Sequence, residues 1–353
     1  MSHQMRILVI RRGAIGDVII TLPTFGILRE YHPDAYIQVI GNGEYWEIAH
    51  KRYYVDAMSA GETKLIPELY SKDGKPSKEI TDYFSSFDLI LAYINDPKRI
   101  VKENLKRIGG KRILVCPPFP KGDDLHAADY TALILREIGL DVNPPLFPKV
   151  HLRSEDLDFA SQSLSSLIET VETHCNASLQ TEFRSSIAYK PLVAIHPRTY
   201  GIKGWAIEKF ISIGKWIENT LGGKSIWLLG PAEEENLKLI KSNFTSSPLL
   251  YMNSLPSVAA ILSFTHLYIG CDTGISHLAA AVGAPVLALF GPTNPHVWGP
   301  RGKKVVMIKA DEMYKIQEDE VMQIILKYNL SQGIEEYKIL TELGLETREG
   351  SEL

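Results

Sequence analysis

Short apolar runs alternate with longer helix-forming stretches along this chain, and the alternation starts twice. The first series begins with Arg6–Ile10 and the second with Leu192–His196. Apolar runs of this length are typical of strands buried on both faces of a parallel sheet. Strands that alternate with helices form βαβ units with right-handed crossovers. The pattern therefore predicts an α/β protein in which two doubly wound parallel-sheet domains face a central cleft.

Each series continues with runs of the same kind. The further strands expected in the first half are Tyr36–Ile40, Phe87–Tyr93 and Arg112–Cys116. Those expected in the second half are Ser225–Leu229, Leu267–Gly270 and Pro285–Phe290, the last strong strand of the pattern. Ligands of open α/β sheets bind beyond the carboxyl ends of strands, so the turns that follow these runs are the candidate sites.

The length of 353 residues also favours two domains. We expect a first Rossmann-like domain over residues 1–153, a polar helical connector over 154–190 and a second Rossmann-like domain over 191–328. Residues 329–353 are expected to form a C-terminal tail. The polar segment 62–82 is broken by Gly and Pro, which predicts an excursion or lid rather than core.

Composition excludes several classes of protein. The chain is 45% hydrophobic and 23% charged with a formal net charge of −4, which gives no reason to expect a nucleic-acid partner. Arg11 and Arg12 interrupt the first apolar run, and no run approaches the roughly 18 residues of a transmembrane helix. We expect a cytoplasmic protein without a transmembrane segment, and peripheral association with the inner membrane stays open.

The three cysteines are far apart in the sequence and form no CxxC motif. A disulfide framework or a structural zinc site is therefore not expected. Cys271 adjoins a candidate site, but a small buried apolar residue is its expected role.

The turn in CDTGISHLAAAVGAP is the more informative of two glycine-bearing turns. Asp272, Thr273 and Gly274 stand where a helix begins, and the free N–H groups and dipole of a helix N-terminus favour an anion such as phosphate. A capped buried helix without a ligand is the alternative. His277 lies one turn further on and is either a packing residue or part of the same site.

The turn RRGAIGD follows the first apolar run. Gly13 and Gly16 permit a tight turn, and Asp17 opens the next helix, where it either caps that helix or acts chemically. The spacing is GxxG rather than the GxGxxG of dinucleotide-binding proteins, and the Walker pattern is absent.

Two further loops carry charged side chains. Arg198, Thr199 and Lys203 cluster in IHPRTYGIKGW, where they are either solvated or neutralise a diphosphate. Glu233 in GPAEEENLK either complements the helix dipole or accepts hydrogen bonds from ribose hydroxyls.

These segments together resemble the ADP-heptose–lipopolysaccharide heptosyltransferase family, glycosyltransferase family nine. The similar segments are MRILVIRRGAIGDVIITLP, AIHPRTYGIKGWAIEKF, WLLGPAEEE and CDTGISHLAAAVGAPVLALFGPTNP, which occur in the family's order. The similarity extends from about residue 5 to 328. The run DTGxSHxA…GxP…FGPT is specific, whereas the GD turn is specific only in combination with the others.

The resemblance implies a GT-B fold, with the acceptor bound by the first domain and the nucleotide-sugar donor by the second. It implies an inverting, metal-independent glycosyltransferase that moves a heptose or similar sugar from an ADP-sugar. The implied acceptor is a hydroxyl group of a lipopolysaccharide core or related glycan. The nucleotide sugar is a co-substrate, and neither a cofactor nor a metal is expected.

The resemblance also assigns roles to residues of this chain. Asp17 matches the catalytic base, and the candidate acceptor-binding residues are Arg12, Gly13 and Gly16. The candidate donor-binding residues are Arg198, Thr199, Lys203, Glu233, Asn253, Ser254, Asp272, Thr273, Gly274 and His277. Among these, Lys203, Thr273 and Gly274 match donor-phosphate contacts, Asp272 a contact to the donor sugar, Glu233 a ribose contact, and Asn253 and Ser254 the adenine-side loop. Arg12, Gly13 and Ala14 replace the small hydroxyl residues that the family usually has before the GD pair.

Three alternatives remain open from the sequence. One is a GT-B glycosyltransferase for another nucleotide sugar and a different small-molecule or surface-glycan acceptor. Another is an NAD-binding oxidoreductase, against which the incomplete glycine pattern argues. The last is a sugar-nucleotide-binding protein without catalytic activity.

Overall fold

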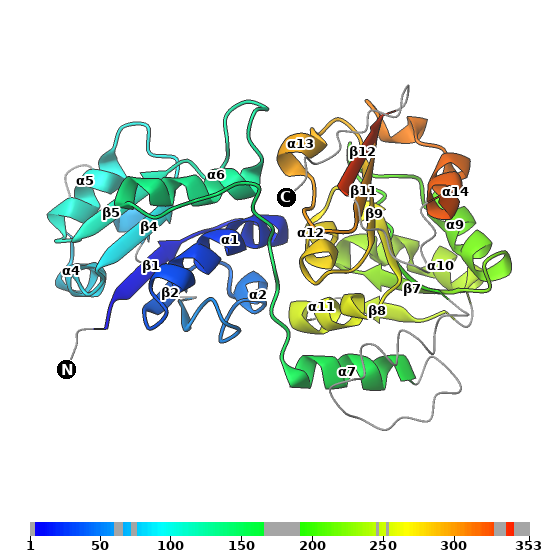
Figure 1. Cartoon of the computed structure of the whole chain (residues 1–353), viewed down its shortest axis with the longest axis horizontal. Coiled ribbons are helices and arrows are strands. Elements are labelled where there is room, and N and C mark those ends of the chain that lie inside the picture. The colour runs from blue at the N-terminus through cyan, green and yellow to red at the C-terminus, as the bar shows by residue number, and fades with distance from the viewer. Residues whose placement is uncertain are drawn as a thin grey trace. The chain divides into compact units, whose positions relative to one another are not determined.

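The chain divides into two compact units, Met1–His151 and Leu152–Leu353, each built on one parallel sheet. The computed structural model describes residues 4–59, 66–71, 76–165, 191–244, 247–251, 254–327 and 337–341. Two α/β units with doubly wound parallel sheets confirm the predicted fold class. Figure 1 labels the helices and strands of both units.

The first unit contains a sheet of five strands in the order β3-β2-β1-β4-β5. The strands are β1 (Arg6–Ile10), β2 (Tyr36–Ile40), β3 (Ala57–Ser59), β4 (Leu89–Tyr93) and β5 (Arg112–Cys116). The helices are α1 (Ile15–Tyr31), α2 (Gly43–Trp46), α4 (Lys78–Ser85), α5 (Ile100–Arg107), α6 (Ala127–Leu133) and the 3-10 helix η1 (Ile134–Ile138). All neighbouring strands pair in parallel.

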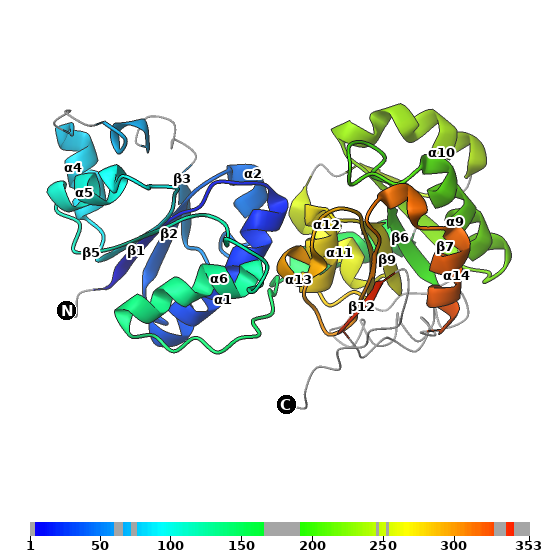
Figure 2. The ribbon, with the colours of Figure 1, turned by 90° about the horizontal axis from the view of Figure 1, so that it is seen from above.

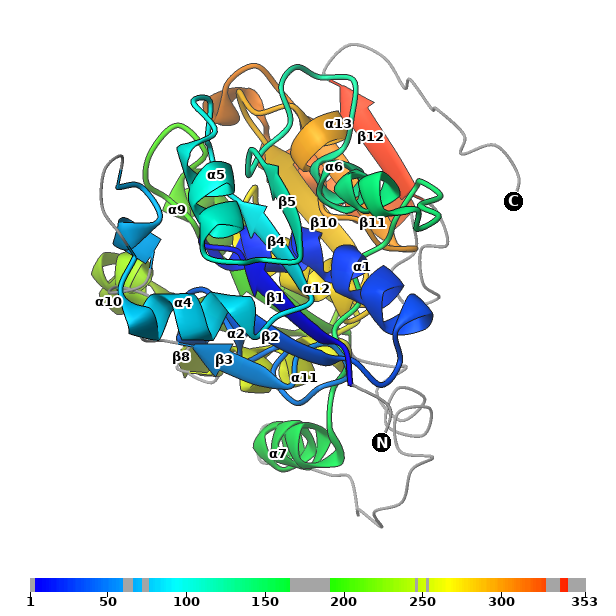
Figure 3. The same ribbon diagram turned by 90° about the vertical axis from the view of Figure 1, so that its left-hand side faces the viewer.

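Helices cover both faces of this sheet, as Figures 2 and 3 show. On one face, Leu8 and Ile10 of β1 lie in a buried cluster with Phe84 of α4 and Leu105 of α5. On the other face, α1 and α6 pack side by side. Since successive side chains of a strand point to opposite faces, continuous apolar strands are what a sheet covered on both sides requires.

The second unit contains a sheet of seven strands in the order β12-β11-β10-β9-β6-β7-β8. The strands are β6 (Leu192–His196), β7 (Lys224–Leu229), β8 (Leu249–Tyr251), β9 (Leu267–Cys271), β10 (Val286–Phe290), β11 (Val305–Lys309) and β12 (Tyr337–Thr341). The helices are α7 (Ser154–Ser165), α9 (Ile207–Asn219), η2 (Pro231–Asn236), α10 (Leu237–Asn243), α11 (Leu255–Ser263), α12 (Gly274–Ala281), α13 (Pro295–Trp298), η3 (Met313–Lys315) and α14 (Glu318–Lys327). These strand pairs are also parallel.

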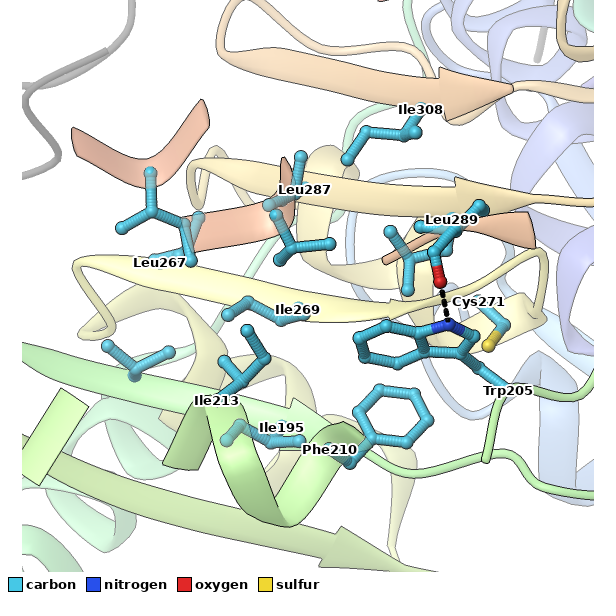
Figure 4. Close-up of a cluster of buried hydrophobic side chains, with 14 of the residues drawn as sticks. Ile195, Trp205, Phe210, Ile213, Leu267, Ile269, Cys271, Leu287, Leu289 and Ile308 are labelled. Atoms are coloured by element: carbon cyan, nitrogen blue, oxygen red, sulfur yellow. Dashed lines mark hydrogen bonds between the residues drawn. The ribbon is translucent and has the colours of Figure 1, made fainter. Parts of the chain in front are cut away.

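The core of the second unit lies between the sheet and helices α9, α10 and α14 (Figure 1). Trp205 and Phe210 lie at its centre, with their rings 4.9 Å apart in an edge-to-face arrangement. Figure 4 shows both rings against Ile269, Cys271 and neighbouring strand residues. The indole N–H of Trp205 donates to the carbonyl of Ile316 at 3.0 Å, so this buried donor is satisfied. Helices α11 and α12 cover the opposite face of the sheet (Figures 1 and 2).

The structure contains strands that the sequence pattern did not predict. Both sheets have a three-residue edge strand, β3 and β8, which is too short to give an apolar period. Pro285–Phe290 is not the last strand, because β11 and β12 extend the second sheet beyond β10. Helix α1 also runs through Pro23, although proline removes one backbone N–H from the helix.

Two segments expected to lie outside the core are partly described. The first part of the expected connector is α7, which packs against α11 and buries Ala160 and Leu164. Within 62–82, Ile66, Leu69 and Ile80 are buried in the core of the first unit. Residues 62–65, 72–75 and 166–190 lie outside the described part of the chain. Among the described residues, none of the helices combines the length and apolarity needed to cross a bilayer.

We predict that Phe210→Ala destabilises the second unit by about 3–5 kcal/mol, because it removes a buried ring and leaves a cavity beside Trp205. Urea denaturation followed by circular dichroism measures the change. Leu239→Ala is the control, since Leu239 on α10 is 39% exposed and its loss should change the free energy of unfolding by less than about 0.5 kcal/mol. Equal effects of the two substitutions would contradict the assignment of Phe210 to the core.

Candidate functional site

The polar candidates of the second unit meet at one edge of its sheet. Strands β10, β9, β6 and β7 are consecutive neighbours and run parallel, so their carboxyl ends lie at the same edge. The loop after β9 carries Asp272 and Thr273, the loop after β6 carries Arg198 and Lys203, and the loop after β7 carries Glu233. Residues that are distant in the sequence are thereby brought together.

Helix α12 begins at Gly274, directly after β9. Thr273 is its N-cap residue and has an extended backbone, with φ −140° and ψ 164°. Seven residues of the helix, Ile275 to Ala281, are buried, and Gly283 with φ 84° follows its end. The first turn of an α-helix has N–H groups without intrahelical partners, and the helix dipole adds positive potential there. This end of α12 therefore has the local features of an anion-binding site.

Asp272 links the α12 end to two neighbouring loops. Its Oδ2 accepts hydrogen bonds from Lys203 Nζ at 2.5 Å and from Thr293 Oγ1 at 2.7 Å. Asp272 is 8% exposed, whereas about a third of the Lys203 side chain is exposed. The ion pair therefore places the ammonium group of Lys203 beside the N-terminus of α12.

The loop between β6 and α9 holds Lys203 in this position. The Trp205 backbone N–H donates to the Arg198 carbonyl at 2.9 Å, which closes the loop. A Cβ atom at Gly204 would overlap the backbone of Thr199, so the close approach of the two ends of the loop requires glycine. In the same loop, the Arg198 guanidinium lies 4.3 Å from the centre of the Tyr200 ring, which is a cation–π contact.

His196, the last residue of β6, lies between two of the predicted donor-binding residues. Its Nδ1 is 3.3 Å from Thr273 Oγ1, and its Nε2 is 3.7 Å from Glu233 Oε1. Burial, together with the smaller effect of the nearby charge of Arg198, lowers the pKa of His196 to about 4. His196 is therefore neutral at pH 7, with one nitrogen protonated and the other free to accept a hydrogen bond.

Hydroxyl groups beneath Thr273 complete this network. Ser276 Oγ donates to the Cys271 carbonyl at 2.5 Å and lies 3.1 Å from the Tyr268 hydroxyl and 3.4 Å from Thr273 Oγ1. Tyr268 and Ser276 are fully buried. The polar atoms under the helix terminus are thus satisfied by one another.

Glu233 lies in the first turn of η2 and is buried. Its Oε2 accepts from the Gly230 backbone N–H at 2.8 Å, so Glu233 caps the start of η2, where the sequence suggested a carboxylate that complements the helix dipole. Its Oε1 faces His196 instead. Burial raises the pKa of Glu233, and the hydrogen bond from Gly230 and the nearby charge of Arg198 oppose that shift.

The other predicted donor-binding residues have simpler surroundings. Thr199 Oγ1 accepts from Asn236 Nδ2 at 2.9 Å, and Ser254 is the N-cap of α11. His277 is buried within α12. Asn253 lies outside the described residues.

The buried thiol of Cys271 has the structural role that the sequence predicted. It lies in the core cluster of the second unit, and burial raises its pKa to about 12. A thiol with this pKa stays protonated and is not a nucleophile at neutral pH.

The turn after β1 in the first unit holds Asp17 at the start of α1. Its Oδ2 accepts from the Ala14 backbone N–H at 2.7 Å, so Asp17 caps this helix. Gly13 has φ 147°, and a Cβ there would overlap the Asp17 carboxylate, which explains the glycine. The Asp17 side chain is 18% exposed, so the cap leaves part of the carboxylate open to solvent.

Arg11, which was not among the predicted site residues, forms an ion pair with Asp17. Its guanidinium is fully buried, lies 3.5 Å from Asp17 Oδ1, and donates to Thr21 Oγ1 at 3.0 Å and the Pro118 carbonyl at 3.0 Å. The predicted acceptor-binding residue Arg12 is exposed, as is Gly13, and Gly16 is half-buried. The signal that separates them is nearness to the strand: Arg11 directly follows buried β1 and its backbone N–H still donates to the Ile40 carbonyl, whereas Arg12 lies one residue further into the turn.

His196 and Thr293 are also site residues that sequence reasoning missed. Both lie within the segments that carry the family resemblance, IHPRTYGIKGW and FGPTNP. Within the described ranges, the structure has no group of three or more His, Cys, Asp or Glu residues arranged to hold a metal ion.

Comparisons with known proteins agree with this arrangement. The family model described as glycosyltransferase family 9 (heptosyltransferase) matches residues 132–328. The lipopolysaccharide heptosyltransferase 1 of Escherichia coli O18:K1:H7 is 32% identical over 136 residues, which cover 38% of this chain and 41% of that protein. The match thus spans about two fifths of the length of this relative.

Two solved structures share the fold over nearly their whole length. The glycosyl transferase family 9 protein from Veillonella parvula DSM 2008 has a TM-score of 0.70 at 17% identity, over 94% of this chain and 99% of that one. The E. coli heptosyltransferase WaaC with ADP has a TM-score of 0.62 at 20% identity, over 92% and 99% of the two chains. Together with the two parallel-sheet units, these similarities establish the GT-B fold.

The buried, neutral His196 predicts a pH dependence of stability. In the folded chain its pKa is about 4, against an ordinary value of 6.5, so between these pH values only the unfolded chain binds the proton. The free energy of unfolding should therefore fall as the pH is lowered from 6.5 towards 4. Glu233 acts in the opposite direction, because its raised pKa lets the folded chain bind a proton first.

We predict that His196→Asn flattens this dependence. Between pH 7 and pH 5 the free energy of unfolding of the wild type should fall by about 1–2 kcal/mol more than that of the variant. Urea denaturation at both pH values measures the decrease in the free energy of unfolding for each protein. The two decreases are compared with each other, so any change in stability that the substitution causes at pH 7 cancels. Equal losses in the two proteins would show that His196 is not neutral in the folded chain.

Proposed function

This chain belongs to glycosyltransferase family 9, the heptosyltransferase family, and we propose that it transfers a heptose from ADP-heptose to a hydroxyl group of a lipopolysaccharide core. The proposed reaction inverts the anomeric configuration of the sugar and needs no metal ion. The family membership and the fold support the glycosyl transfer. The donor, the acceptor and the stereochemistry are proposed from the site residues and from the relatives.

The observation that carries the proposal is the N-terminus of α12 with Lys203 beside it. When the glycosidic bond of a nucleotide-sugar donor breaks, the nucleoside diphosphate is the leaving group. Its negative charge grows as the bond breaks. Backbone N–H groups at Thr273 and Gly274 and the ammonium group of Lys203 supply fixed positive potential for that charge. Charge stabilisation of this kind does in the protein what a divalent metal does in other transferases.

The carboxylates of this site suit the rest of the donor. Asp272 Oδ2 is held by Lys203 and Thr293, which leaves its other oxygen as an acceptor for a sugar hydroxyl. Glu233 Oε1, the oxygen that Gly230 does not bind, is the proposed acceptor for ribose hydroxyls. Since WaaC was solved with ADP, we take ADP as the nucleotide.

The first unit supplies the proposed base, Asp17. Its carboxylate is fixed from two sides, by the Ala14 N–H and by Arg11, and stays partly exposed. As the new C–O bond forms, the acceptor hydroxyl becomes acidic and its proton passes to this carboxylate. A positioned general base of this kind contributes about 10²–10⁴-fold to the rate.

We predict that Asp17→Asn lowers kcat by about 10²–10⁴-fold, while ADP still raises the melting temperature as in the wild type. The amide of Asn cannot take the proton, whereas the residues of the proposed nucleotide site belong to the other unit. Transfer is measured with ADP-heptose and lipopolysaccharide that lacks heptose, and binding by thermal denaturation with ADP, UDP and GDP.

The matched control is Asp124→Asn, which makes the same chemical change at an exposed loop position of the same unit. It should leave kcat unchanged. Normal transfer by Asp17→Asn would remove Asp17 from the mechanism. Stabilisation of the wild type by UDP but not by ADP would contradict ADP-heptose as the donor.

Transfer should also continue after metal removal. We predict that EDTA followed by desalting leaves kcat within about twofold, because helix α12 and Lys203 provide the stabilisation that a metal would otherwise supply. Lys203→Met should lower kcat in the chelated and the untreated enzyme alike. Loss of transfer on chelation and its recovery with Mg²⁺ would contradict this part of the proposal.

A further inference from the structure

His196 occupies a position that the proposed function does not yet use. It ends β6 in the middle of the four-strand edge and contacts Thr273 on one side and Glu233 on the other. Thr273 belongs to the proposed diphosphate site and Glu233 to the proposed ribose site. The following inference rests on that proposed function and concerns how the two parts of the donor site are held.

The hydrogen bonds around Thr273 can be assigned from their neighbours. Ser276 uses its single proton for the Cys271 carbonyl, so the Tyr268 hydroxyl donates to Ser276 Oγ. Thr273 has one proton and two neighbouring acceptors, Ser276 Oγ at 3.4 Å and His196 Nδ1 at 3.3 Å. The imidazole nitrogen is the more basic of the two when it carries no proton.

The carboxylate of Glu233 determines which nitrogen of His196 carries the proton. A neutral imidazole has one N–H, and Glu233 Oε1 is the acceptor oxygen that faces Nε2. With the proton on Nε2, the N–H points at Glu233 and Nδ1 accepts the hydroxyl proton of Thr273. The distance of 3.7 Å to Glu233 is longer than a hydrogen bond, so this contact is an electrostatic one.

We propose that His196 is a positioning residue that orients both recognition elements of the donor site, Thr273 through Nδ1 and Glu233 through Nε2. Through Nδ1 it fixes the Thr273 side chain and with it the extended backbone that directs the first N–H groups of α12 at the diphosphate. Through Nε2 it directs one carboxylate oxygen of Glu233 at the ribose. The two nitrogens can have these different roles only while burial keeps His196 neutral, because an imidazolium could not accept a hydrogen bond from Thr273.

Substitutions that keep only one nitrogen position separate the two roles. In His196→Asn the amide oxygen takes the place of Nδ1 and can accept from Thr273, but nothing replaces Nε2. In His196→Gln the amide N–H takes the place of Nε2 and can donate to Glu233, while Nδ1 is lost. His196→Leu removes both. Leu239→Ala, an exposed substitution on α10, is the control for changes unrelated to the site.

Titration calorimetry gives the dissociation constants for ADP, AMP and 2′-deoxy-ADP. Their ratios measure the recognition of the diphosphate and of the ribose separately. The AMP-to-ADP ratio reports recognition of the second phosphate, and the 2′-deoxy-ADP-to-ADP ratio reports recognition of the ribose. Loss of either oriented contact should reduce the corresponding ratio by about three- to tenfold. We expect His196→Asn to leave the AMP-to-ADP ratio unchanged and to reduce the 2′-deoxy-ADP-to-ADP ratio. His196→Gln should have the opposite effect, and His196→Leu should reduce both ratios.

A purely structural role for His196 would weaken binding of all three nucleotides in proportion and leave both ratios unchanged in every variant. That result, or equal changes of both ratios in His196→Asn and His196→Gln, would overturn the inference while the proposed function stands. Melting temperatures of the variants without nucleotide identify any that fail to fold, and the two ratios are compared among the folded ones. If wild-type protein binds none of the three nucleotides, the proposed function fails and the inference fails with it.

Discussion

The parallel order β10-β9-β6-β7 is the constraint on which the site of the second unit depends. Neighbouring parallel strands end at the same edge, and the chain returns to the other edge before each new strand. Every loop that leaves a carboxyl end therefore starts beside the others. Lys203 and Asp272 are 69 residues apart in the sequence and form an ion pair of 2.5 Å because β6 and β9 are neighbours. His196 and Thr273, 77 residues apart, meet for the same reason.

Burial then decides the state of each group at this edge. In a low-dielectric interior an unpaired polar group is costly, so the hydroxyls of Tyr268 and Ser276 are satisfied within the network. The same burial keeps His196 neutral and raises the pKa of Glu233. Lys203 is about a third exposed, so its ammonium group, although paired with Asp272, stays accessible to a ligand. The first unit uses the same principle, because buried Arg11 fixes Asp17 while the carboxylate stays partly open.

Much of this could be predicted from the sequence, and the remainder could not for physical reasons. Apolar runs and glycine-bearing turns gave the α/β architecture, the strand ends and the two turns that matter. They missed β11, although VVMIK is an apolar run, and the short edge strands, which carry too few residues for a period. The family resemblance supplied the roles of Asp17, Lys203, Glu233 and Thr273, and those roles stay predictions.

Side-chain partners could not be predicted, because they depend on which strands become neighbours. His196 is an ordinary strand-end histidine in the sequence, and only the β6–β9 and β6–β7 pairings place it between Thr273 and Glu233. Thr293 likewise gains its role from the β9–β10 pairing, which brings its hydroxyl to Asp272. Arg11 was passed over for Arg12, although Arg11 is the residue that directly follows the buried strand β1.

The central claim is that the N-terminus of α12 binds the diphosphate of the donor. A crystal structure of the full chain with ADP tests it most directly. The account predicts phosphate oxygens within hydrogen-bond distance of the Thr273 and Gly274 backbone N–H groups, with Lys203 Nζ beside them and the ribose against Glu233. A nucleotide bound instead at the turn Gly13–Asp17 of the first unit, with the α12 terminus unoccupied, would contradict it.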